Sequence, residues 1–139
     1  MARAKGEPSA PRLILDSGAV IAASRGDDRA LAYLRRAVEV DAEVRIPVAV
    51  VAETVRGGQR DASVYRVLNA VGRCEPTPEA VGRLAGELLG RARRNNTIDA
   101  LVVAEALSIG GAVVLTGDPD DLSALTDRAP GVQIVALNR

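Results

Sequence analysis

The chain has 139 residues, a typical length for one domain, with 18 acidic residues, 18 basic residues, no His and a single Cys. The absence of His excludes Ser–His–Asp triads, Cys–His pairs and His-ligated zinc, and a single Cys excludes internal disulfides and thiolate zinc clusters. Because the formal net charge is zero, any contact with nucleic acid requires a local basic patch.

The predicted elements begin after a charged amino-terminal stretch. Residues 1–11 contain two prolines and lack the apolar run of a secretory signal, so we predict a disordered tail in front of one domain at residues 12–139. No apolar run approaches the roughly 18 residues that a membrane helix needs, and the unpaired Cys74 suits a reducing compartment. We therefore expect a cytoplasmic protein without a membrane span.

Short apolar runs alternate with amphipathic stretches through the rest of the chain. Residues 13–15 are typical of a buried strand, and Ser17 is a candidate cap for a helix over residues 18–23. Further helices are expected at residues 27–40, 48–56, 61–70, 78–94, 98–109 and from 119 onward. Further strands are expected at residues 44–47, 73–75, 112–115 and 132–137. This alternation predicts an α/β sandwich with a mainly parallel central sheet.

Four acidic residues stand where an acid is costly or directed. Asp16 and Asp118 each end an apolar strand, which places both at the carboxyl edge of the sheet, where ligands bind in such folds. Glu53 follows the apolar run 48–52, where an ionised acid is costly unless it is paired or bound to metal. Asp99 lies in the first turn of an apolar helix. Two strands and two helices thus each direct one acid toward a common region.

Each position also has a simpler structural explanation. Asp16 and Asp118 can act as helix caps, and the helix dipole favours an acid at Asp99. For Glu53 the alternatives are a buried ion pair with an Arg or an edge position facing water. If the four acids do meet, their mutual repulsion favours a bound cation. Oxygen ligands without His or Cys select Mg²⁺ or Mn²⁺, a site that suits phosphodiester hydrolysis.

The four acidic segments together resemble a known family. They are residues 13–19 (LILDSGA), 51–57 (VAETVRG), 97–104 (TIDALVVA) and 113–118 (VVLTGD). In order and spacing they resemble the PIN domain, and most closely the VapC-type toxins of bacterial toxin–antitoxin pairs. The resemblance covers roughly residues 12–139. It implies a PIN-like three-layer α/β/α sandwich and an endoribonuclease that depends on Mg²⁺ or Mn²⁺, is usually dimeric and is inhibited by a small cognate antitoxin.

The same resemblance implies roles for individual residues. Asp16, Glu53, Asp99 and Asp118 would be the catalytic acids. The family often has a further acid just after the fourth, for which Asp120 and Asp121 compete; we choose Asp120 as a metal ligand beside Asp16, Asp99 and Asp118. Ser17 matches a small hydroxyl residue that supports metal or phosphate, with a simple helix cap as the alternative.

Other segments are candidates for contacts with RNA and with partner chains. Arg91, Arg93 and Arg94 follow one another at a helix end near Asp99, where they would meet RNA phosphates, or else form a solvated helix end that the dipole favours. The antitoxin is expected to pack its carboxyl-terminal segment on the domain. The amphipathic helices at residues 27–40 and 61–70 are candidates for a two-fold homodimer.

Three other functions are alternatives to the ribonuclease. A DNA-acting 5′ or flap-type nuclease of the same fold usually needs extra helical elements to thread a strand. A receiver-like signalling domain needs a lysine after a late strand, and Lys5, the only lysine, lies in the tail. A catalytically silent PIN scaffold stays open, although silent versions tend to lose acids and all four stand in this chain.

Overall fold

A computed structural model describes residues 11–127 and 129–137 of the chain, so the predicted tail lies outside the described residues except for Pro11. Four strands form one sheet: β1 (Arg12–Leu15), β2 (Glu43–Arg45), β3 (Ala112–Thr116) and β4 (Val132–Ala136). They run parallel in the order β2-β1-β3-β4, which confirms the predicted parallel sheet. The strand expected at residues 73–75 is only a single parallel bridge between Arg45 and Arg73.

Seven helices lie within the described residues. They are α1 (Ser17–Ser24), α2 (Asp28–Glu39), α3 (Val48–Thr54), α4 (Asp61–Val71), α5 (Glu79–Ala92), α6 (Thr97–Ser108) and α7 (Pro119–Leu125). Each predicted helix is present, with differences at the ends. Asp16 rather than Ser17 is the cap of α1, because its side chain accepts from the Ala19 amide. Helix α3 ends at Thr54, two residues before the predicted end at residue 56. None of the described helices has the length and apolarity to cross a membrane.

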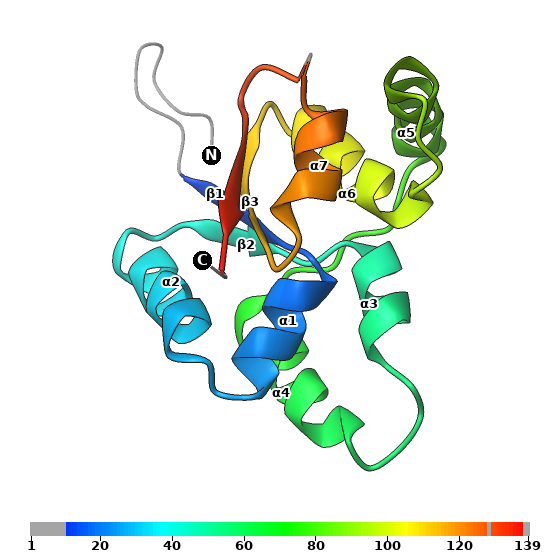
Figure 1. Ribbon diagram of the computed structural model, residues 1–139. Helices are drawn as coiled ribbons and strands as arrows, with labels where there is room; N and C mark the ends of the chain where they lie inside the picture. Colours follow the sequence, from blue (N-terminus) through cyan, green and yellow to red (C-terminus); the bar gives the residue numbers. More distant parts are fainter. Residues whose placement is uncertain (1–10, 128, 138–139) are drawn as a thin grey trace.

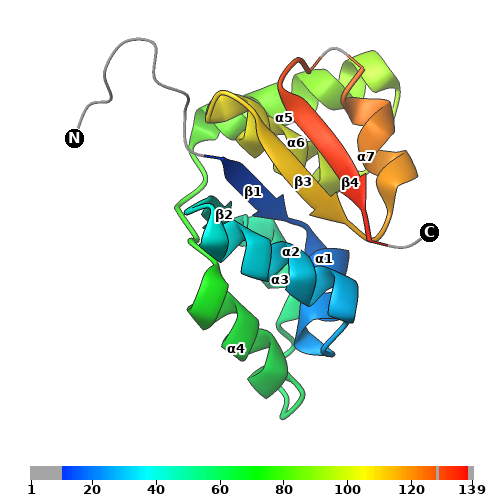
Figure 2. The same ribbon diagram turned by 90° about the vertical axis from the view of Figure 1, so that its left-hand side faces the viewer.

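The helices form layers on the two sides of the sheet (Figure 1). Helices α1 and α2, which connect β1 to β2, lie on one side, and α7, which connects β3 to β4, lies with α6 on the other (Figure 2). Right-handed crossovers in opposite directions along the sheet produce this arrangement. Helix α5 packs on the outside of α6. The core between the layers contains the fully buried Ile14, Leu15, Val114 and Leu115.

The direction of the chain changes between the two central strands. From β1 the chain proceeds to β2 on one side, and from β3 it proceeds to β4 on the other. The loops that follow β1 and β3 therefore leave the sheet toward opposite faces, and open α/β sheets bind ligands at such a position. Strand register places Leu15 beside Leu115, so the residues after these strands are neighbours.

Two glycines allow the loops after β1 and β3 to approach each other closely. A Cβ atom added to Gly18 would lie 3.0 Å from the amide nitrogen of Gly117 and 3.1 Å from its Cα. Side-chain carbons rarely lie this close to backbone atoms, so a side chain at Gly18 would force the backbone of Gly117 to move by a few tenths of an ångström. The absence of a side chain at Gly18 therefore helps the start of α1 to lie close to the β3–α7 loop.

The loop between α3 and α4 is fixed by Asp61. The side chain of Asp61 is buried, and its carboxylate accepts from the backbone amides of Arg56 and Gly57. Backbone donors stabilise the buried charge, so this residue has a structural role.

Candidate active site

Asp16 is held at the carboxyl end of β1 by bonds to both carboxylate oxygens. Its Oδ1 accepts from the Ala19 amide at 3.0 Å, and its Oδ2 accepts from the hydroxyl of Thr116. The side chain is buried, and this burial raises the pKa of Asp16 above its ordinary value despite the hydrogen bonds. The negative charge of Asp99 raises this pKa further.

Thr116 connects the two strand-terminal acids. It is fully buried at the end of β3, where its hydroxyl donates to Asp16 and accepts from the Asp118 amide at 2.8 Å. One hydroxyl therefore fixes the first acid against the backbone of the fourth. Sequence reasoning missed this residue, although a hydroxyl side chain that ends an apolar strand just before a glycine was the available signal.

Asp118 has the position of a helix cap without the bond of one. It precedes α7, but its side chain makes no capping hydrogen bond, and it is exposed to solvent. The pKa of Asp118 is raised first by the charge of Asp121, then by a hydrogen bond with that carboxyl group, and further by Asp99 and Asp120. The cap explanation that sequence allowed therefore does not account for this side chain.

Asp99 is the centre of the acidic cluster. It lies half-buried in the first turn of α6, where its Oδ2 accepts from the Asn96 side-chain amide at 2.9 Å. Burial raises the pKa of Asp99, the Asn96 bond lowers it, and the charges of Asp121 and Glu53 raise it again. Because Asp99 also acts on Asp16 and Asp118, it is coupled by charge to four other acids.

Glu53 lies at the rim of this cluster. It is exposed, and it accepts a hydrogen bond from the hydroxyl of Ser17. The prediction that Glu53 lies in an apolar, buried setting is wrong, because the short helix α3 buries Val50 and Thr54 and turns Glu53 toward water. Among the described residues no Arg pairs with it, which leaves the water-facing edge of the two alternatives.

The acids after Asp118 differ in their relation to the cluster. Asp121 is half-buried and acts on both Asp118 and Asp99, whereas Asp120 is exposed and has the smallest effect on the pKa of Asp118. One step along a helix turns a side chain by about 100°, so these two neighbours differ in burial and in the number of cluster acids on which they act. The geometry thus favours Asp121 over Asp120, the residue chosen from sequence.

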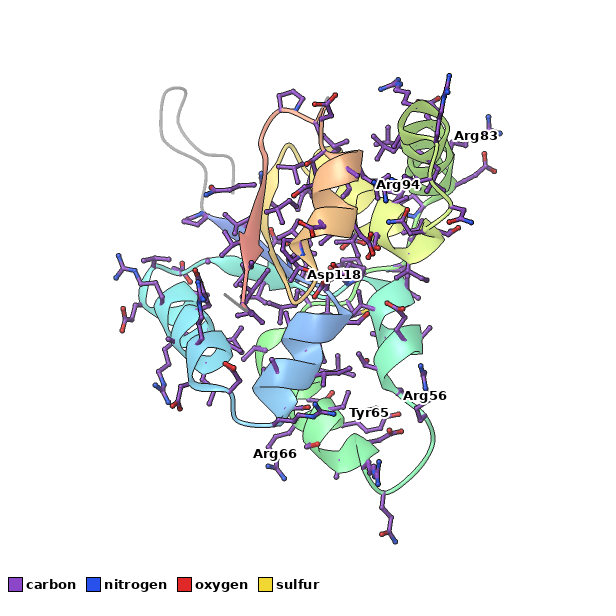
Figure 3. All side chains as sticks on the ribbon, viewed as in Figure 1. Arg56, Tyr65, Arg66, Arg83, Arg94 and Asp118 are labelled. Carbon is purple, nitrogen blue, oxygen red and sulfur yellow. The ribbon has the colours of Figure 1, made fainter. Side chains whose placement is uncertain are left out.

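Of the three arginines at the end of α5, one reaches the acids. Arg94 lies with Nη1 3.9 Å from Oδ1 of Asp121, and Figure 3 shows it above Asp118. Arg91 instead pairs with Glu87 on its own helix at 4.0 Å. Arg93 ends α5 in the left-handed conformation, with φ of 53°.

The donor set matches a hard divalent cation. The cluster offers carboxylate and hydroxyl oxygens, and its raised pKa values reflect burial and repulsion that a cation would offset. In the described part of the chain, however, no three acidic side chains lie close enough to enclose an ion as they stand. Three carboxylates accept bonds from Thr116, Asn96 and Ser17, so a cation would compete with these donors.

Comparison with protein families gives one match. The family model of the PIN domain matches residues 13–127 of the chain, which include all the acids of the cluster. Among curated protein sequences none matches.

Solved structures of bacterial proteins share the fold. VapBC2 from Rickettsia felis, bound to a DNA fragment from its promoter, aligns with a TM-score of 0.70 and 16% identity over 90% of this chain and 98% of that chain. FitAcB from Neisseria gonorrhoeae aligns with a TM-score of 0.67 and 19% identity, over 90% of this chain and 97% of that chain. VapBC-5 of the VapBC toxin–antitoxin family from Mycobacterium tuberculosis aligns with a TM-score of 0.58 and 22% identity, over 92% of this chain and 99% of that chain. At these identities the likeness concerns the fold.

Proposed function

The chain belongs to the PIN-domain family, and on this premise we propose that it is a metal-dependent endoribonuclease that acts as the toxin of a toxin–antitoxin pair. The observation that carries the proposal is the position of Asp99, which is coupled by charge to acids from β1, α3 and the β3–α7 segment. A fold gains nothing in stability from collecting like charges, whereas a site for a cation and a phosphodiester requires them.

Asp16, Asp99, Asp118 and Asp121 would hold Mg²⁺ or Mn²⁺, with Asp121 in the place that sequence reasoning gave to Asp120. When bound, the ion supplies an acidified water and offsets negative charge on the transition state. Thr116 and Asn96 keep the carboxylates of Asp16 and Asp99 in place before a cation arrives.

Two further side chains act on the substrate in this proposal. Glu53, exposed and held by the Ser17 hydroxyl, accepts a proton from the attacking water. Arg94 exchanges Asp121 for a substrate phosphate and stabilises its charge. Because water rather than the ribose 2′-hydroxyl attacks, the products carry a 5′-phosphate.

An antitoxin partner is supported by the structural neighbours, which include complexes described as VapBC and as a toxin–antitoxin complex from Klebsiella pneumoniae. For the homodimer, the two candidate helices now differ. Helix α2 exposes Val38, which is 75% accessible. The aliphatic side chains of α4 pack on this chain's own core instead; they are Val64, Val67, Leu68 and Val71. We therefore place the dimer contact on α2, and light scattering at micromolar concentration that shows only monomer would remove it.

The proposed function is tested by digestion of matched RNA and single-stranded DNA in Mg²⁺ or Mn²⁺. We expect RNA fragments with 5′-phosphates, no cleavage in excess EDTA, and relief of toxicity when the neighbouring gene is co-expressed. Preferential digestion of DNA would favour the DNA-acting alternative, and inactivity on both would favour a silent scaffold.

A further inference from the structure

A basic surface lies on the side of α3 and α4. We name Arg56, Arg60, Tyr65 and Arg66 the α3–α4 patch; all four are exposed. Tyr65 is 46% accessible and is one of only two aromatic residues in a chain without Phe or Trp. Figure 3 shows Arg56, Tyr65 and Arg66 at the α3–α4 end of the molecule, below Asp118, with Arg56 and Arg66 on either side of Tyr65 in this view.

The charge of the patch is not balanced by neighbouring acids. Residues 56–66 contain three Arg and a single acid, Asp61, whereas Arg73, farther along the chain, pairs with Glu43 and Glu75. That acid is buried, and backbone amides occupy its carboxylate. Seven arginines elsewhere in the described residues lie within 4.0 Å of an acid, whereas those of the patch have no such described partner. In a chain with zero net charge, this segment is therefore a local positive surface.

Two residues of the patch, Tyr65 and Arg66, lie on one exposed face of α4. Ala62, Tyr65, Arg66 and Asn69 are exposed at a spacing of three to four residues, which is one face of α4. At the end of α3, Nη1 of Arg56 donates to the carbonyls of Ala52 and Val55 at 2.8 and 3.0 Å. This fixes the guanidinium while leaving other N–H groups for a ligand.

The patch is joined to the acidic cluster through two elements. Arg56 follows Glu53 by three residues and lies just beyond the end of α3. Helix α1, which begins directly after Asp16, packs against both α3 and α4. A strand whose phosphate lies at the acids can therefore continue past Glu53 onto the patch.

We infer that the α3–α4 patch binds the single-stranded RNA substrate beside the cleavage site, with phosphates on the three arginines and one base stacked on Tyr65. The identity of this ligand rests on the proposed function. Guanidinium groups bind phosphate with two N–H groups, and an exposed aromatic ring stacks on any base. A two-fold contact between copies through this face would place arginines opposite arginines, so self-association is the poorer use of the surface.

Binding is measured without cleavage on the full chain carrying Asp99→Asn, by fluorescence anisotropy of labelled RNA of about 4 and about 16 nucleotides, the range of strand lengths that such sites occupy. The double variant Arg60→Gln with Arg66→Gln changes side chains that make no hydrogen bond or ion pair in the described structure. Its control is Arg35→Gln with Arg83→Gln, two exposed arginines outside the patch, of which Arg83 pairs with Glu79 on its own helix.

For the longer RNA, loss of two phosphate contacts should reduce the slope of log affinity against log salt by about 1.4, which is roughly 25-fold at 0.1 M relative to 1 M salt. Tyr65→Leu should weaken binding at least about fivefold with the salt slope unchanged. The control should match the parent protein. Because the shortest RNA cannot span both regions, the double variant should bind it almost as the parent does.

A second readout reports the stack directly. The chain has no Trp, so in a Tyr33→Phe background its intrinsic emission comes from Tyr65 alone. RNA should quench this emission, and a ribose-phosphate strand without bases should not.

Three results overturn the inference. The first is that the double variant binds the longer RNA as its control does, and the second is that RNA leaves Tyr65 emission unchanged. The third is that the variants keep their RNA affinity but no longer bind a co-expressed acidic protein, which would make the patch a protein-docking surface. In each case wild-type RNA cleavage can persist, so the proposed function stands. Conversely, patch-dependent RNA binding by a wild-type chain that cleaves no RNA would contradict the proposed function alone.

Discussion

Replacing Asp99 by Asn should stabilise the metal-free protein while abolishing its activity. Asp99 is coupled to Asp16, Glu53, Asp118 and Asp121, and like-charge pairs at partly exposed sites cost a few tenths of a kcal/mol each. Four pairs sum to about 1 kcal/mol. Asn keeps the shape, and its carbonyl oxygen can still accept from Asn96. The free energy of unfolding in EDTA should therefore rise by about 1 kcal/mol, which raises Tm by about 4 °C.

The assay compares thermal melts of wild type and Asp99→Asn in EDTA and in increasing Mg²⁺, with RNA cleavage in parallel. Mg²⁺ should raise the Tm of wild type because it binds the folded state, and it should raise that of the variant much less. Cleavage should fall by about 100-fold or more, since even indirect supports of a metal site are worth 10–100-fold. Glu87→Gln, which removes an exposed acid of α5 outside the cluster, should change neither property appreciably. An Asp99→Asn protein that is clearly destabilised in EDTA and cleaves RNA at the wild-type rate would show that Asp99 is neither a source of repulsion nor a residue of the active site.

Three further predictions follow from the same geometry. Thr116→Val leaves a buried acceptor and a backbone donor without their partner, so chemical denaturation should show a loss of about 2 kcal/mol and cleavage should fall, while Thr116→Ser should restore both. Gly18→Ala should lower the free energy of unfolding by about 1–3 kcal/mol, because its Cβ would separate the loops after β1 and β3. In the control Gly117→Ala, the added Cβ would lie 3.5 Å from its nearest neighbour, so the loss should be roughly 0.5 kcal/mol or less. Equal losses of stability in urea melts would contradict the close approach of the two loops. Asp16, Asp99 and Asp118 have folded-state pKa values above the ordinary 3.8, so just above that pH the folded state holds more protons than the unfolded state. Their contribution therefore makes the stability of the metal-free protein fall as pH rises through the raised pKa values. Melts in EDTA between pH 4 and 7 should show this decline, which Mg²⁺ should reduce, and a rise attributable to these groups would contradict the prediction.

Much of the fold could be predicted because it depends on local patterns. Residues 13–15 and 112–115 are apolar runs that end in a polar residue or turn, so the strands, the parallel sheet and the position of Asp16 and Asp118 at its carboxyl edge were evident from sequence. The order and spacing of the acids likewise indicated that distant segments meet.

The remaining features depend on which face of an element is covered. The apolar neighbours of Glu53 in sequence suggest a buried side chain. In the structure, however, the short helix α3 buries Val50 and Thr54 and exposes Glu53, and only the packing of the helix determines which side is exposed. The same applies to Glu105, which is buried on α6, where burial raises its pKa and Arg45 lowers it. The bond from Thr116 to Asp16 joins residues 100 positions apart, and no local pattern encodes such a contact.

Metal binding by the acidic cluster is tested most directly by a titration of Mn²⁺ followed by electron paramagnetic resonance, because free Mn²⁺ gives a sharp signal that is lost when the ion binds. We expect wild type to remove Mn²⁺ signal at a stoichiometry of one or two ions per chain, as acid clusters of this kind bind. Asp99→Asn should leave most of the signal in place, and addition of Mn²⁺ to the wild-type protein should start RNA cleavage over the same concentration range. A wild-type chain that leaves the Mn²⁺ signal unchanged, yet cleaves RNA in excess EDTA, would contradict a metal-dependent active site.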